Sequence, residues 1–100
     1  MKIKQVHDYI ENNKDIYLER FTELVSQPSV GTNKTDIRNC AHLLEQRMIE
    51  MGIDAKIVET NGNPIVFGEL KAQREDAPTI LFYGHYDVQP AGDPKLWISP

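Results

Sequence analysis

The sequence has 100 residues, of which 40% are apolar and 26% are charged, and its formal net charge is −4. This size and composition are typical of at most one globular domain with a modest core. The negative charge argues against nucleic acid as a partner, because the chain has no basic patch that would neutralise phosphates.

A first helix is predicted over residues 3–26, where apolar side chains recur at spacings of three, four and seven residues. Asn12 and Asn13 are weak helix formers and mark either a kink or a join between two helices. Pro28 ends the segment, and a polar loop follows over residues 29–34. The apolar stripe of this helix consists of Val6, Ile10, Tyr17, Phe21 and Leu24.

A second helix is predicted from Asp36 to Met51, with Thr35 as its N-cap and Gly52 as its stop. Asp36 is favourable in the first turn, because the helix dipole is positive there. The predicted core stripe of this helix consists of Ile37, Cys40, Leu44, Met48 and Met51.

The apolar period then changes to two. Ala55–Thr60 and Pro64–Leu70 are predicted strands, and Asn61-Gly62 between them indicates an antiparallel hairpin. Thr79–Tyr86, opened by Pro78, is apolar on both faces, which is typical of a central strand covered by helices on both sides. Two helices, a hairpin and a buried strand predict an α/β layered fold with a mixed sheet.

The chain has one cysteine, Cys40, so neither an internal disulfide nor a thiolate zinc cluster can form. The N-terminal stretch Met1 to Asp8 carries several charges but is not followed by an apolar stretch, so no signal peptide is expected. The longest apolar run, Ile80 to Tyr83, is far too short to span a membrane. We expect a soluble, cytoplasmic protein with no membrane partner.

His85 and Asp87 are the candidate functional residues. Side chains alternate along a strand, so both point the same way, with Cα atoms about 6–7 Å apart. They follow a buried strand, and ligands of open α/β sheets bind beyond the carboxyl ends of strands. An imidazole is a metal ligand at neutral pH, and a nearby carboxylate can orient its other nitrogen. The plain alternative is a polar strand end that happens to pair a histidine with an aspartate.

The stretch Tyr83-Gly84-His85-Tyr86-Asp87-Val88-Gln89-Pro90, followed by Gly92-Asp93 and Leu96-Trp97, resembles the first metal motif of the di-zinc metallo-exopeptidase family. That family includes carnosine-type dipeptidases, aminoacylases, glutamate carboxypeptidases and acylornithine or succinyl-diaminopimelate deacylases. The resemblance implies a metallopeptidase with a three-layer zinc-peptidase domain. It further implies that His85 is a zinc ligand. Asp87 would be the family's catalytic aspartate, which supports the zinc-bound imidazole without binding the metal itself.

The same resemblance implies two zinc ions in the parent protein, with cobalt or manganese also compatible. It implies a small peptide or N-acyl amino acid as substrate and a homodimeric parent. The family's remaining ligands, its general base and its lid or dimerisation domain have no counterpart before Pro100. Residues 1–100 are therefore expected to be an incomplete N-terminal part of the catalytic domain, inactive alone and prone to associate.

Other polar residues have ordinary interpretations. Cys40 is expected in the core, and His7 and His42 at the surface. Trp97 either caps the site or a subunit contact, or packs as an apolar anchor. The alternative function is a stand-alone, non-enzymatic α/β interaction module that uses its apolar strand as a binding surface.

Overall fold

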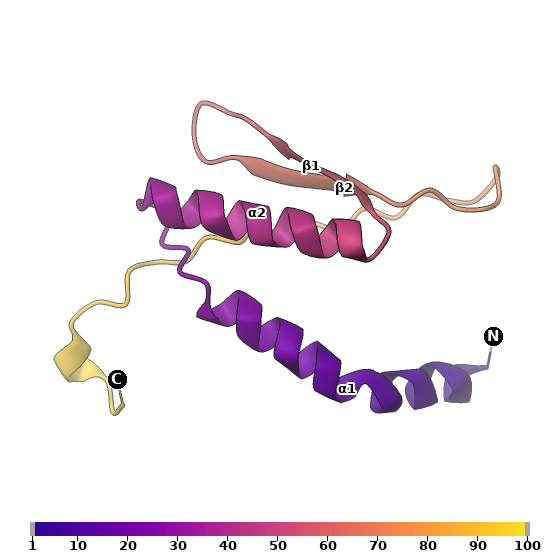
Figure 1. The fold of residues 1–100 in the computed structure, drawn as a ribbon, viewed down its shortest axis with the longest axis horizontal. Coiled ribbons are helices and arrows are strands. Elements are labelled where there is room, and N and C mark those ends of the chain that lie inside the picture. The colour runs from indigo at the N-terminus through magenta and orange to yellow at the C-terminus, as the bar shows by residue number, and fades with distance from the viewer. Residues whose placement is uncertain (1, 100) are drawn as a thin grey trace.

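The computed structural model describes residues 2–99. Its elements, in chain order, are helix α1 (Ile3–Ser26), helix α2 (Lys34–Glu50), strand β1 (Asp54–Val58), strand β2 (Ile65–Glu69) and the short 3-10 helix η1 (Pro94–Leu96). The two strands form an antiparallel hairpin that lies along one side of α2, and α1 lies on the other side (Figure 1). The predicted helices and hairpin are thus confirmed, with ends that differ by one or two residues.

The cap of α2 differs from the sequence prediction. Asn33, not Thr35, is the N-cap, and its side chain accepts a hydrogen bond of 3.1 Å from the backbone amide of Asp36. Asparagine caps a helix at least as well as threonine, so the helix begins two residues earlier than predicted. At the other end Gly52 has a φ of 82°, which is the left-handed conformation expected of a helix stop.

The hairpin connection is longer than a two-residue turn. It runs from Glu59 to Pro64, and neither Asn61 nor Gly62 has a positive φ. The Thr60 hydroxyl closes the loop, because it donates to the carbonyl of Asn63 at 2.8 Å and accepts from the amide of Gly62 at 3.0 Å. The turn signal therefore predicted the hairpin, and a side chain determines the shape of its loop.

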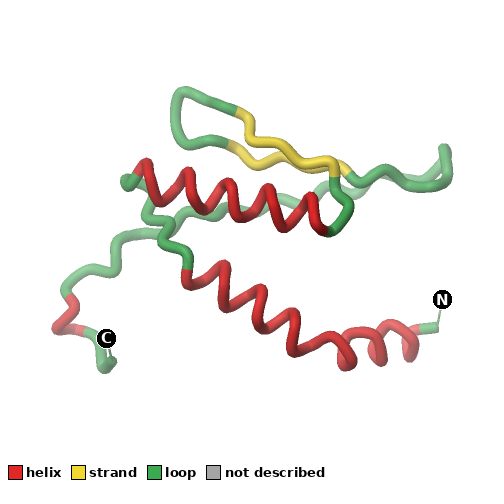
Figure 2. Tube along the Cα trace, in the orientation of Figure 1, coloured by secondary structure: helices red, strands yellow, loops and turns green. Residues whose placement is uncertain are grey.

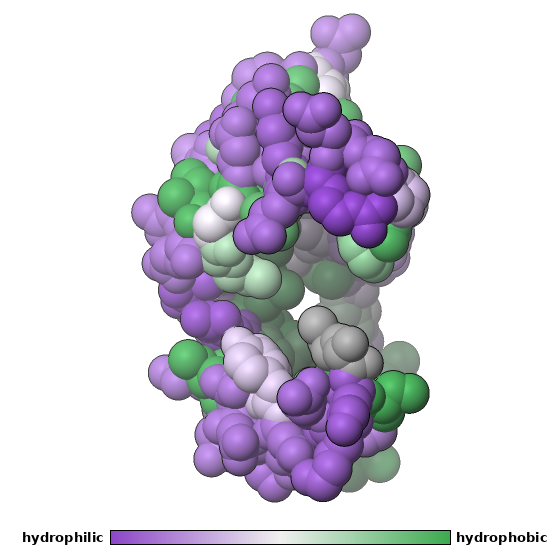
Figure 3. Space-filling model, turned by 90° about the vertical axis from the view of Figure 1, so that its right-hand side faces the viewer, coloured by the Kyte–Doolittle hydropathy of each residue, from purple (hydrophilic) through white to green (hydrophobic). Residues whose placement is uncertain are grey.

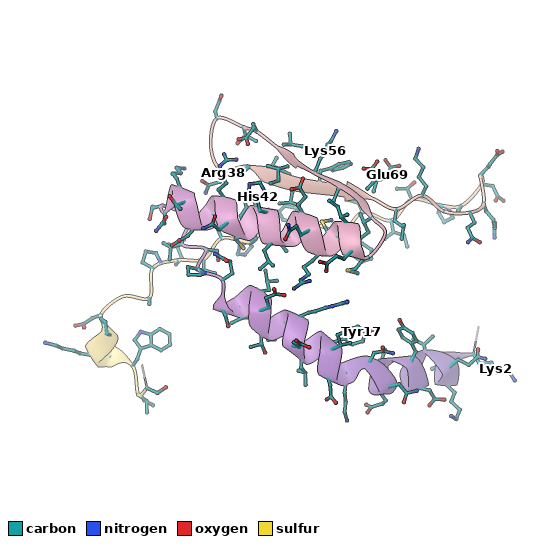
Figure 4. All side chains as sticks on the ribbon, viewed as in Figure 1. Lys2, Tyr17, Arg38, His42, Lys56 and Glu69 are labelled. Carbon is teal, nitrogen blue, oxygen red and sulfur yellow. The ribbon has the colours of Figure 1, made fainter. Side chains whose placement is uncertain are left out.

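The core lies between α2 and the segments packed against it. Ile37, Cys40 and Ala41 are the buried apolar residues of α2, and Ser29 is buried beside them. Arg38 and His42 lie on the face of α2 that is turned toward the hairpin (Figure 4). The Arg38 guanidinium donates to both carboxylate oxygens of Glu59, at 2.7 and 3.0 Å, and so joins α2 to the end of the hairpin.

Helix α1 has no buried residue, and its apolar stripe stays open to solvent: Phe21, for example, is 64% exposed. An ion pair between Glu23 and Arg47 links α1 to α2, next to a cleft of about 400 Å³. Hydrophilic residues cover much of the face in Figure 3, and an opening separates the upper part of this view from the lower part. The radius of gyration is 17.1 Å, against about 13 Å for a compact domain of this length.

The predicted central strand is corrected by the structure. Residues 79–86 form an extended stretch with no strand pairing, and the sheet has two strands among the described residues instead of three (Figure 2). Ile80, Leu81 and Phe82 are 73%, 85% and 89% exposed. A strand that is apolar on both faces requires neighbours on both edges and covering layers on both faces, and residues 2–99 do not supply them. No helix in this part of the chain has the length and apolarity to cross a membrane.

The close contact between α2 and β2 depends on Gly68. An added Cβ at this position would stand 2.6 Å from Met48 Cε and 2.8 Å from Ile53 Cγ2. We predict that Gly68→Ala lowers the free energy of unfolding by about 1–3 kcal/mol, because a methyl group would overpack this contact. Gly62→Ala is the matched control, since its nearest neighbour would be Thr60 Oγ1 at 3.8 Å. Equal denaturant midpoints for the two variants would contradict the prediction.

Candidate metal site

The His85–Asp87 segment is anchored on both sides by backbone groups of other elements. Val88 forms an isolated parallel bridge with Val30, in which its amide donates to the carbonyl of Ser29 at 2.9 Å. The Val88 carbonyl accepts from the amide of Gly31 at 3.2 Å. On the other side, the Tyr86 hydroxyl donates to the carbonyl of Pro64 at 2.5 Å. The loop before α2 and the end of the hairpin loop therefore hold the segment in place.

The predicted pairing of His85 with Asp87 is present. His85 Nδ1 lies 2.9 Å from the Asp87 carbonyl oxygen and 3.2 Å from Asp87 Oδ1. Both partners are acceptors, so Nδ1 carries the proton and donates. In the neutral imidazole the other nitrogen, Nε2, then has a free lone pair. The His85 side chain is 75% exposed. The arrangement matches a histidine prepared to bind a metal through Nε2.

Burial raises the pKa of two weakly acidic side chains at the site, Tyr86 of the motif and Cys40 of α2. The phenol of Tyr86 has a raised pKa, chiefly because the ring is partly buried and further because Cys40 and Asp87 lie near it. The pKa of the Cys40 thiol is also raised by burial, although a hydrogen bond with Ser29 opposes that effect. Both groups are therefore neutral near pH 7, and Cys40 is a core residue as the sequence predicted.

The described residues do not by themselves form a metal site. No group of three or more His, Cys, Asp or Glu side chains within residues 2–99 is placed to hold a metal ion. His7 on α1 and His42 on α2 are both exposed, as predicted. The donor chemistry of His85 fits zinc, but a catalytic zinc takes three protein ligands. Near His85, the segment offers one imidazole and the carboxylate that its Nδ1 contacts.

The sequence did not indicate the groups that hold the motif. Ser29 and Gly31 act through backbone atoms, which carry no sequence signal, and the motif string does not indicate the hydrogen bond of Tyr86 to Pro64. Trp97 is 61% exposed and donates from its indole nitrogen to the Ala91 carbonyl at 2.9 Å. It closes the turn around η1 and does not contact the His85–Asp87 pair by any hydrogen bond.

Comparisons with known proteins agree with the motif. A cysteinylglycine-S-conjugate dipeptidase of Corynebacterium striatum is 30% identical over 90 residues, which cover 87% of this chain and 20% of that protein. A succinyl-diaminopimelate desuccinylase of Paracidovorax citrulli is 31% identical over 84 residues, 78% of this chain and 21% of its own length. The same enzyme of Hahella chejuensis is 33% identical over 87 residues, 83% of this chain and 20% of its own length.

The chain spans about a fifth of the length of these curated relatives. No family model matches the sequence, and no solved structure matches it. The matches to a dipeptidase and to desuccinylases confirm the resemblance to the di-zinc metallo-exopeptidases.

Proposed function

We propose that this chain, a sequence relative of the di-zinc metallo-exopeptidases, is the N-terminal part of the catalytic domain of a zinc-dependent hydrolase. The reaction would be cleavage of an amide bond in a dipeptide or an N-acyl amino acid. The observation that carries the proposal is the His85–Asp87 pair, with Nδ1 bonded to Asp87 and Nε2 free. The names of the relatives, a dipeptidase and desuccinylases, support this substrate class.

Each residue has a defined task in this proposal. Zinc would supply the Lewis acidity that activates water for attack on an amide carbonyl. His85 would bind zinc through Nε2, and Asp87 would hold the proton on Nδ1 and orient the ring. Val88 and Tyr86 would keep the pair at the edge of the site through their bonds to Ser29 and Pro64.

The exposed apolar segment supports placement in a larger domain. Residues 79–86 have a composition suited to a buried strand, yet the apolar side chains of Ile80–Tyr83 are exposed among the described residues. We propose that further strands of the parent protein pair with this segment and complete a three-layer domain with a mixed sheet. The cytoplasmic location and the homodimeric parent stay predictions from the sequence and the resemblance.

A second candidate function uses the same exposed segment. A stand-alone interaction module would bind another protein through Ile80–Tyr83 and would need no metal. The two candidates differ in their dependence on zinc. The orientation of the His85–Asp87 pair favours the hydrolase, because an interaction surface has no use for a fixed imidazole tautomer.

We predict that His85→Ala in the full-length protein removes one equivalent of zinc per chain and nearly all turnover. The reason is that no other imidazole of residues 2–99 lies beside the motif. Metal content by mass spectrometry and peptidase assays measure the two effects. His7→Ala, at an exposed position on α1, is the matched control. Two zinc ions and full activity in His85→Ala would overturn the assignment.

We predict a different result for Asp87→Ala. This variant should keep most of its metal but lose about 10–100-fold in metal affinity or rate, as is typical when the partner of a metal-bound histidine is removed. Asp87→Asn should recover part of the loss, because an amide oxygen can still accept from Nδ1. If Asp87→Ala instead loses the metal as completely as His85→Ala does, Asp87 is a direct ligand.

Residues 1–100 alone should bind zinc weakly and should not hydrolyse dipeptides, since one motif ligand is present. We also expect this polypeptide to associate or to be only partly ordered, because apolar side chains at 79–83 are exposed and unpaired backbone groups invite edge pairing. Size-exclusion chromatography with light scattering and a zinc titration test both points. A cooperatively folded monomer would contradict the expected association. Tight zinc binding with dipeptide hydrolysis would contradict the expectation that residues 1–100 lack a complete metal site.

A further inference from the structure

The loop between α1 and α2 lies directly against the carboxylate of the candidate site. Its backbone pairs with Val88 through Ser29 and Gly31, at 2.9 and 3.2 Å. This pairing brings Gly31 beside the side chain of Asp87. An added Cβ at Gly31 would lie 3.0 Å from Asp87 Oδ2, 3.7 Å from its Cβ and 3.8 Å from its Cγ. A residue with a side chain would therefore press on the carboxylate.

The backbone of Gly31 does not itself require glycine. The positive φ angles among the described residues occur at Gly52 and Gly92, so Gly31 has a conformation that other residues adopt readily. What glycine provides at this position is space. The carboxylate uses that space on its Oδ2 side, while Oδ1 on its other side faces His85 Nδ1 at 3.2 Å.

The hairpin loop fixes the distance between Gly31 and the motif. The Asn63 side-chain amide donates to the carbonyl of Gly31 at 3.0 Å. Lys34 Nζ donates to the side-chain oxygen of Asn63, Oδ1, at 2.9 Å. Because Oδ1 faces a donor, the Asn63 NH₂ group must point toward Gly31. The next residue, Pro64, accepts the bond from the Tyr86 hydroxyl. The same loop thus holds both Gly31 and the residue before Asp87.

We propose that Gly31 and Asn63 are positioning residues for Asp87. Gly31 leaves the room that the carboxylate needs to face His85, and Asn63 holds Gly31 at that distance. This inference rests on the proposed function, because it gives the Asp87–His85 hydrogen bond a role in metal binding. It adds that the strength of that bond is set from the loop before α2 and from the hairpin loop, neither of which contains a metal ligand.

The expected effect follows from the geometry. A Cβ at 3.0 Å forces the carboxylate or the loop to move by a few tenths of an ångström, and the Oδ1 to Nδ1 distance is already 3.2 Å. Complete loss of such a partner costs about 10–100-fold in affinity or activity, so a displaced partner should cost about threefold to tenfold.

The test is a double-mutant cycle in the full-length protein, with zinc affinity measured by chelator competition and KM and kcat measured separately. Gly31→Ala should weaken zinc binding or lower kcat by about threefold to tenfold and leave KM unchanged. In an Asp87→Ala background the same substitution should have no further effect, because the group it displaces is gone. Gly62→Ala, in the open part of the hairpin loop, should match the native protein.

Asn63→Ala provides an independent arm that adds no atom near Asp87. It removes the bond to the Gly31 carbonyl, so it should shift zinc affinity or kcat in the same direction and should also lose its effect in the Asp87→Ala background. This arm decides the matter if Gly31→Ala does not fold, as judged by thermal unfolding.

Two failures are distinguishable. If His85→Ala keeps its zinc, the proposed function is wrong. If His85→Ala loses zinc while Gly31→Ala and Asn63→Ala equal Gly62→Ala, or while their effects persist unchanged without Asp87, only the positioning inference is wrong.

Discussion

The backbone pairing of Val88 with Ser29 and Gly31 is the contact on which the candidate site depends. It joins two segments far apart in the sequence, and it is the sole β-bridge outside the hairpin among residues 2–99. Ser29 is buried and lies within hydrogen-bond reach of Cys40 on α2, so the bridge ties the motif to the packed region around α2. Without it, the segment that carries His85 and Asp87 would keep the Tyr86–Pro64 hydrogen bond but lose its link to the loop before α2.

The packing of the chain is uneven in a way that agrees with this arrangement. The buried side chains gather where α2 meets the loop and the motif, whereas α1 and residues 79–83 keep their apolar side chains exposed. Apolar burial contributes about 25 cal/mol per Å², so these exposed groups represent stabilisation that residues 2–99 do not realise. The packed residues therefore lie next to the candidate site, whereas the apolar side chains of α1 and of residues 79–83 remain exposed among the described residues.

Local signals in the sequence predicted much of this structure. Apolar periodicity predicted both helices, Gly52 predicted the end of α2, and Asn61-Gly62 predicted the hairpin. The contact between His85 and Asp87 was predicted from their two-residue spacing on a strand, and it is present although residues 79–87 form no strand. The failures are non-local. Residues 79–86 have the composition of a buried strand, but pairing depends on neighbours that composition cannot supply. The backbone bonds of Ser29 and Gly31 and the space beside Gly31 carry no residue-type signal at all.

The central claim is that His85 presents Nε2 to zinc while Asp87 holds Nδ1. A crystal structure of the zinc-loaded full-length protein, with anomalous scattering measured at the zinc edge, tests it most directly. We expect a zinc peak about 2.0–2.1 Å from His85 Nε2, with Nδ1 still bonded to Asp87. A zinc ion on Nδ1, an Asp87 carboxylate oxygen bound directly to zinc, or no zinc at His85 would contradict it.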